Sequence, residues 1–82
     1  FWIVGADMLG ETLYYEYDYI QPTAVVIGSE GSGISRLVRE NCDTLIRIPL
    51  YGKINSLNAA VAAALIVFQA ARKREESGIS LE

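Results

Sequence analysis

Two residue types that carry much of enzyme chemistry are scarce in this chain of 82 residues: histidine is absent, and Cys42 is the single cysteine. The lack of histidine excludes a Ser-His-Asp triad, a histidine-ligated zinc site and an imidazole base within the chain. One cysteine excludes an internal disulfide and a multi-cysteine metal site. We therefore expect no metal centre, and any chemistry must use other side chains.

Long hydrophobic runs are also lacking. The longest unbroken apolar run covers residues 59–68, whereas a membrane-spanning helix needs about 20 apolar residues. No basic segment precedes an apolar run in the way that is typical of a signal peptide. The sequence therefore predicts a soluble, cytoplasmic protein that does not enter a membrane.

An excess of positive charge is missing as well, since seven basic and ten acidic side chains give a net charge of −3. A small domain that binds nucleic acid alone is expected to be basic, so RNA contacts would need residues outside this chain. The length suits one domain. The chain starts without methionine inside a strand-like run, Phe1 to Gly5, which we interpret as a fragment of a longer protein.

The apolar and turn-forming residues alternate in a pattern typical of an α/β protein. A β-branched run ends at Gly28, Pro49 stops a later one, and Ser35 can cap a short helix. We expect strands at residues 1–6, 24–27 and 44–48, helices at about 36–41 and 57–76, and a turn-rich connection over 7–23. This order predicts a mostly parallel sheet with crossover helices.

The last predicted helix is apolar almost all round over residues 57–68 and is rich in alanine. A helix without a polar face has to be enclosed by protein. Because 82 residues can hardly surround a helix, we expect either an unusual wrapping of the fold or cover from a second subunit.

A glycine-rich loop, GSEGSG at residues 28–33, lies between a predicted strand and a helix, where open α/β sheets bind ligands. It fits neither common phosphate loop, because Ile34 replaces the Walker lysine and Arg36 replaces the third glycine of the dinucleotide pattern. Glu30 would repel a phosphate and suits a cationic or hydroxyl-bearing ligand better. The alternative is that the glycines only make a tight turn and Glu30 is a solvated charge.

A second group of residues, IPLYG at 48–52 followed by NSLN at 55–58, links the strand over 44–48 to the last helix. Ser56 is a natural N-cap, and Asn58 is expected in the first helical turn, facing the strand ends. Each residue alone is more typical of a structural cap. Their order and spacing after the glycine loop favour a shared site.

Residues 24–74 together closely resemble the C-terminal half of the SpoU/TrmH-type RNA ribose 2′-O-methyltransferases. The resemblance is carried by three linked signatures: G-x-E-G-x-G, I-P-hydrophobic-x-G and S-L-N-x-x-x-A. Three signatures in this order are far more specific than one glycine loop. The segment Phe1 to Gly5 fits the strand that comes before them in that family.

The resemblance implies an α/β fold with a deep trefoil knot, here over about residues 24–76, in the C-terminal part (residues 1–82) of a methyltransferase domain. It also implies a homodimer that uses S-adenosylmethionine to methylate tRNA or rRNA. The residues matching the family's cofactor-binding positions are Gly28, Ile48, Leu50, Gly52 and Leu57.

The polar positions of the catalytic side, by the same resemblance, are Glu30, Ser56 and Asn58. The reaction is methyl transfer from a sulfonium to a ribose 2′-hydroxyl, which must be aligned and deprotonated. The family's proposed base is an arginine in an earlier motif that has no counterpart here. We therefore expect this chain alone to be inactive in transfer.

Two other functions are compatible with the sequence. One is a non-catalytic knotted module that binds the cofactor or mediates dimerisation. The other is an α/β nucleotide-binding module unrelated to methyl transfer, although the failed Walker and dinucleotide patterns count against it.

Overall fold

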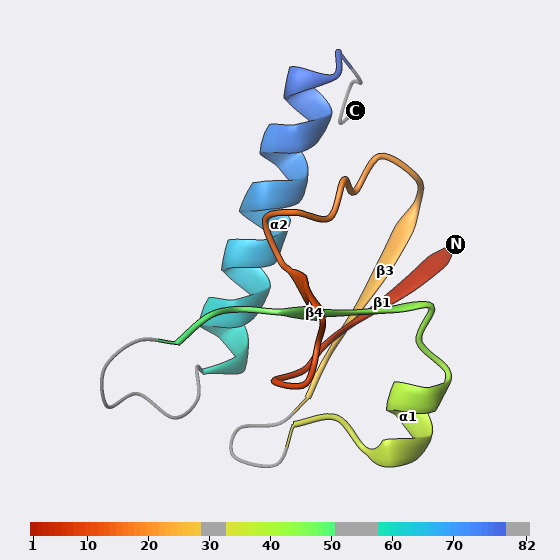
Figure 1. Ribbon diagram of the computed structural model, residues 1–82. Coiled ribbons are helices and arrows are strands. Elements are labelled where there is room, and N and C mark those ends of the chain that lie inside the picture. The colour runs from red at the N-terminus through yellow and green to blue at the C-terminus, as the bar shows by residue number, and fades with distance from the viewer. Residues whose placement is uncertain (29–32, 51–57, 79–82) are drawn as a thin grey trace.

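The computed structural model describes residues 1–28, 33–50 and 58–78 (Figure 1). Its elements are β1 (Trp2–Ala6), β2 (Thr12–Leu13), β3 (Thr23–Ile27), α1 (Arg36–Glu40), β4 (Thr44–Arg47) and α2 (Ala59–Glu76). The predicted strands at 1–6, 24–27 and 44–48 and both predicted helices are therefore confirmed, with ends shifted by up to two residues.

The strands of the described chain form one sheet in the order β2-β4-β1-β3. β1 pairs in parallel with both β3 and β4, and β2 pairs in parallel with β4. The predicted parallel α/β architecture is confirmed. β1 and β4 are the two inner strands, each hydrogen-bonded on both sides.

β2 lies in the region for which the sequence prediction favoured a turn-rich connection. Its two residues pair with β4 through Thr12 and Ile46, and Leu13 and Arg47. Gly10 makes the approach possible, because a Cβ at this position would lie 2.6 Å from the carbonyl carbon of Ile46. A two-residue strand is too short to show a period of two in its sequence.

The two helices pack on opposite faces of the sheet at β1, because successive side chains of a strand point to opposite sides. Val4 is fully buried in a core with Tyr19, Ile46 and Ile66, the last of which belongs to α2. A Cβ on Gly5 would instead meet Cys42 and Ile34, which flank α1. The described part of the molecule therefore has a helix, a sheet and a helix in three layers.

The described residues cover α2 on one side only. Ala62 and Ile66 are buried, while Val61 and Phe68 are 48% and 75% exposed. The described residues thus do not enclose the apolar helix. Among them, no helix is long and apolar enough to cross a membrane.

Candidate functional site

The carboxyl ends of three strands lie in one row. Ala6 at the end of β1 is in register with Ile27 of β3 and Ile46 of β4. Because these strands are parallel, the residues that follow them leave the sheet at the same edge, and Figure 1 shows the start of α2 on this side of the molecule. Ligands of open α/β sheets bind at this edge.

The two ends of the glycine loop, Gly28 and Gly33, lie in close contact. A Cβ on Gly28 would lie 2.0 Å from the carbonyl carbon of Gly33, so a side chain cannot be accommodated there. Gly33 has a φ of 67°, a left-handed conformation that favours glycine. Both glycines are therefore required by the turn itself, and Glu30 lies outside the described residues.

The chain passes directly from this loop into α1. Ile34 is 5% exposed, and Ser35 caps the helix by accepting a hydrogen bond from the Val38 amide at 3.3 Å. The predicted cap is confirmed. Burial at Ile34 and the cap at Ser35 together define where the loop ends.

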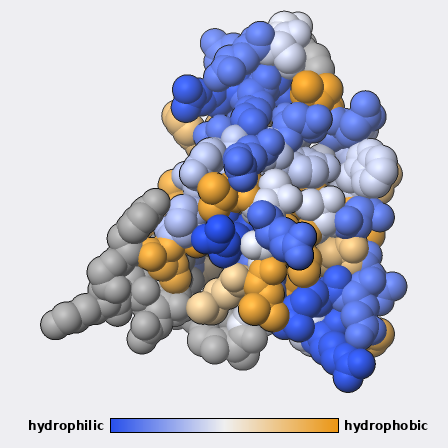
Figure 2. Space-filling view, viewed as in Figure 1, coloured by the Kyte–Doolittle hydropathy of each residue, from blue (hydrophilic) through white to orange (hydrophobic). Residues whose placement is uncertain are grey.

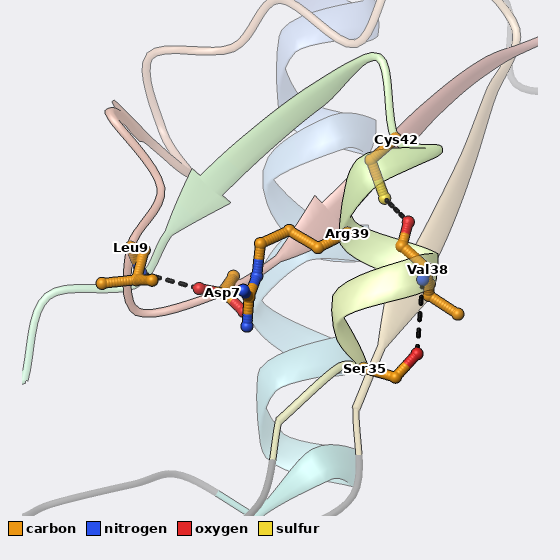
Figure 3. Close-up of polar contacts among 6 residues, drawn as sticks. All are labelled: Asp7, Leu9, Ser35, Val38, Arg39 and Cys42. Carbon is orange, nitrogen blue, oxygen red and sulfur yellow. Dashed lines mark hydrogen bonds and ion pairs between the residues drawn. The ribbon is translucent and has the colours of Figure 1, made fainter.

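The surroundings of Cys42, after α1, favour the protonated thiol over the thiolate. Burial raises the pKa of its thiol, and the carboxylates of Asp43 and Asp7 add to the rise. The thiol donates a hydrogen bond to the Val38 carbonyl at 3.3 Å (Figure 3). A protonated thiol that is already engaged is inert.

Asp7, the first residue after β1, is a site feature that the sequence analysis missed. Its side chain is only 7% exposed and accepts from the Arg39 Nε at 3.2 Å. Its second oxygen accepts from the Leu9 amide at 2.8 Å (Figure 3). The signal that could have found it is an acidic residue directly after a buried strand, at the carboxyl edge of the sheet.

The family of the chain follows from comparison with known proteins. The model of the SpoU rRNA Methylase family matches residues 1–68. The chain belongs to this family. The predicted resemblance to SpoU/TrmH proteins is thereby confirmed.

Individual SpoU and TrmH proteins are similar over nearly all of the chain. A Staphylococcus saprophyticus protein, assigned to the TrmH family of tRNA/rRNA methyltransferases, is 51% identical over 95% of this chain and 31% of its own length. The SpoU methyltransferase AviRb from Streptomyces viridochromogenes, in complex with the cofactor AdoMet, gives a TM-score of 0.85 at 40% identity over 92% of this chain and 30% of its own. An RNA 2′-O ribose methyltransferase gives a TM-score of 0.85 at 35% identity, and the match covers 90% of this chain and 29% of the methyltransferase chain.

The SpoU chain described here thus spans about a third of the length of the relatives that it matches. Their shared part contains the edge of the sheet with the glycine loop.

The predicted SpoU cofactor residues are only partly described. Gly28, Ile48 and Leu50 lie at the carboxyl edge, and the two aliphatic side chains are half-buried. Ile48 also packs against the core. Gly52 and Leu57 lie outside the described residues, as do the predicted catalytic residues Glu30 and Ser56.

Asn58 occupies a different position in the helix from the one predicted. It is the N-cap of α2, not a residue of the first turn, and its side-chain oxygen accepts from the Ala60 amide at 2.8 Å. An asparagine oxygen satisfies an amide that has no partner within the helix. The sequence analysis gave the cap to Ser56, because both residues are good N-caps and their spacing does not separate them.

Within residues 1–28, 33–50 and 58–78, no group of three or more Cys, Asp or Glu side chains could hold a metal ion. The groups that the described site offers are apolar side chains, backbone amides and carbonyls, and the Asp7–Arg39 pair.

Proposed function

We propose that this chain is the cofactor-binding part of an S-adenosylmethionine-dependent methyltransferase that acts on a ribose 2′-hydroxyl of tRNA or rRNA. The observation that carries the proposal is the likeness, over at least nine-tenths of the chain, to a SpoU enzyme with bound AdoMet and to an RNA 2′-O ribose methyltransferase. Both likenesses include the carboxyl edge at which the three strands end.

The residues at this edge suit a cofactor with a large apolar portion. Ile48 and Leu50 offer half-buried aliphatic surface next to the end of β4, and Gly28 brings bare backbone to the same edge. In our proposal they bind S-adenosylmethionine together with Gly52 and Leu57. When bound, the cofactor supplies an electrophilic methyl group on a positively charged sulfur.

The proposed catalytic side consists of Glu30, Ser56 and Asn58. A carboxylate at Glu30 would favour the positive charge of the donor and help to hold the site in shape. Ser56 would align the ribose hydroxyl, and Asn58 would fix the start of α2 through its cap. Neither Ser56 nor Asn58 is a base, and Glu30 has an electrostatic role in our proposal, so we assign removal of the hydroxyl proton to an arginine outside this chain.

The assembly that we propose is a knotted homodimer, with the knot over about residues 24–76. The homodimer is supported by the apolar stripe of α2, which we define as Val61, Leu65 and Phe68. These side chains follow at i, i+4 and i+7 and are 48%, 37% and 75% exposed, so they lie on one side of the helix. Burial against a second copy would remove this surface from water.

Titration of this chain with S-adenosylmethionine, followed by amide NMR, tests the cofactor assignment. We expect saturable shifts at Gly28, Ile48 and Leu50, and no such shifts with ATP. Shifts with ATP alone would favour the nucleotide-binding module instead. A well-dispersed spectrum that responds to neither ligand would contradict the proposed cofactor site.

Substitution of Glu30 in a protein of the relatives' length that contains this chain separates an enzyme from a non-catalytic module. We expect Glu30→Gln to lower the rate of RNA methylation at limiting S-adenosylmethionine by roughly tenfold or more, because the carboxylate that attracts the cationic donor is lost. Glu40→Gln is the matched control, since Glu40 lies on the surface of α1 and is 57% exposed. Equal rates for both variants would favour the non-catalytic module.

A further inference from the structure

The ion pair between Asp7 and Arg39 connects two elements that adjoin the glycine loop. Asp7 follows β1, and Arg39 belongs to α1, the helix that begins directly after the loop. The two residues are 32 positions apart in sequence and meet at 3.2 Å. The pair therefore fixes α1 relative to the row of strand ends.

Asp7 is a rigid acceptor for this contact. Its backbone amide donates to the Ile46 carbonyl of β4 at 2.9 Å, and one carboxylate oxygen receives the Leu9 amide. The other oxygen faces Arg39 (Figure 3). With its backbone and one oxygen already held, the carboxylate cannot rotate to follow a displaced arginine.

A second ion pair on the same helix provides a contrast. Arg36 and Glu40 are side chains of α1 itself, one turn apart, and are 87% and 57% exposed. Such a surface pair contributes little to stability. Asp7 and Arg39 are 7% and 33% exposed, so their contact is better shielded from water and joins separate elements.

α1 needs such an anchor. It has five residues, none of which is buried, and Leu37 is 70% exposed. A helix this short is not stable by itself. Its position depends on the buried Ile34 before it, on Cys42 after it, and on Arg39 within it.

We propose that Asp7 and Arg39 are positioning residues for the glycine loop. By holding α1, they set where Gly33 and Ser35 lie relative to Gly28, and thus how closely the two ends of the loop approach. This inference rests on the proposed function in one respect: the close approach of Gly28 and Gly33 raises the affinity for S-adenosylmethionine. In this proposal both residues act through the position of the loop and not through a contact with the cofactor.

The variants Asp7→Asn and Arg39→Gln test the proposal. Asparagine keeps an oxygen for the Leu9 amide and puts an uncharged NH2 donor in place of the oxygen that accepts from Arg39. We expect each variant to weaken S-adenosylmethionine binding about five- to tenfold in calorimetry, and the double variant to be no weaker than either, since one interaction is lost in all three. Arg39→Lys should restore most of the affinity, and Arg36→Gln, the matched control on α1, should leave it unchanged.

A second measurement does not depend on the cofactor. In the free protein, the amide shifts of Gly28 and Gly33 should move in Asp7→Asn and Arg39→Gln but not in Arg36→Gln. If both variants bind S-adenosylmethionine within twofold of the wild type, or if these shifts stay in place, the positioning role is wrong. If the wild type does not bind the cofactor, the proposed function fails, and the amide shifts alone decide on the positioning role.

Discussion

Tyr19 combines burial, an unusual backbone conformation and a hydrogen bond in one residue. It is 1% exposed, has a φ of 55°, and donates its hydroxyl proton to the Tyr14 carbonyl. Its ring packs edge-to-face against that of Tyr17, with 4.8 Å between the ring centroids. A left-handed conformation costs an ordinary residue about 1 kcal/mol or more, so the contacts of this side chain must compensate for it.

Stability should therefore depend on pH through this phenol. Burial raises the pKa of Tyr19 above its ordinary 10.0, and the phenols of Tyr17 and Tyr14 add to the rise. The folded protein then keeps a proton that the unfolded chain releases. The resulting stabilisation is complete below about pH 10 and is lost as the pH rises further.

Urea unfolding at pH 8 and at pH 11 measures this effect. We expect the free energy of unfolding to fall between the two pH values, and the fall to be smaller in Tyr19→Phe. At pH 8 the same variant should lose about 1 kcal/mol, because its hydrogen bond to the Tyr14 carbonyl is missing. Tyr15→Phe is the control, since Tyr15 is exposed, and an equal pH dependence in both variants would contradict the argument.

At the scale of the element, α2 is held at both ends by polar contacts. Asn58 caps its first turn. Near its C-terminus, the Arg74 guanidinium donates to three consecutive carbonyls of the segment before β3, those of Tyr19, Ile20 and Gln21, at 2.8, 3.3 and 3.2 Å. The planar group of arginine matches several acceptors in a way that lysine cannot.

Arg74→Gln should accordingly destabilise the fold. We expect a loss of about 1.5–3 kcal/mol, the range for hydrogen bonds that involve a charged group, and a smaller loss in Arg74→Lys. Arg72→Gln is the matched control, because Arg72 pairs with Glu76 on the surface of the same helix and such pairs contribute about 0.5 kcal/mol or less. Denaturant unfolding compares the three variants, and similar losses in the two glutamine variants would show that the contacts of Arg74 contribute little.

At the scale of the whole molecule, the hydrophilic and apolar surfaces are separated along α2. Figure 2 shows mostly hydrophilic residues at the C-terminal end of the helix, where Arg72, Lys73 and Arg74 follow one another. The apolar stripe lies in the preceding turns. This division favours association through the first half of α2, with its last turns left in water.

Phe68→Glu tests the proposed association. A buried charge in place of a phenylalanine should weaken a homodimer by about 2 kcal/mol or more, seen as a shift to monomer in light scattering coupled to gel filtration. Phe1→Glu is the control, because Phe1 is 94% exposed and lies outside α2. Circular dichroism should show an unchanged fold in both, and a dimer of full affinity in Phe68→Glu would place the interface elsewhere.

The sequence by itself determined most of the architecture, because the information for it is local. The run at 24–27 and the segment at 44–48 are β-branched or aliphatic stretches with a glycine or proline directly after them. α2 follows from a long alanine-rich apolar segment. The three signatures also identified the family, since each of them is a short contiguous motif.

The tertiary structure alone decided which distant residues meet. Arg39 reaches Asp7 across 32 positions, and Arg74 reaches Tyr19 across 55. β2 and the N-cap at Asn58 likewise emerged only from the fold. A polar contact between separate elements produces no periodic pattern and no compositional bias in the sequence. It depends on how the strands are ordered in the sheet and on where the helices pack against it.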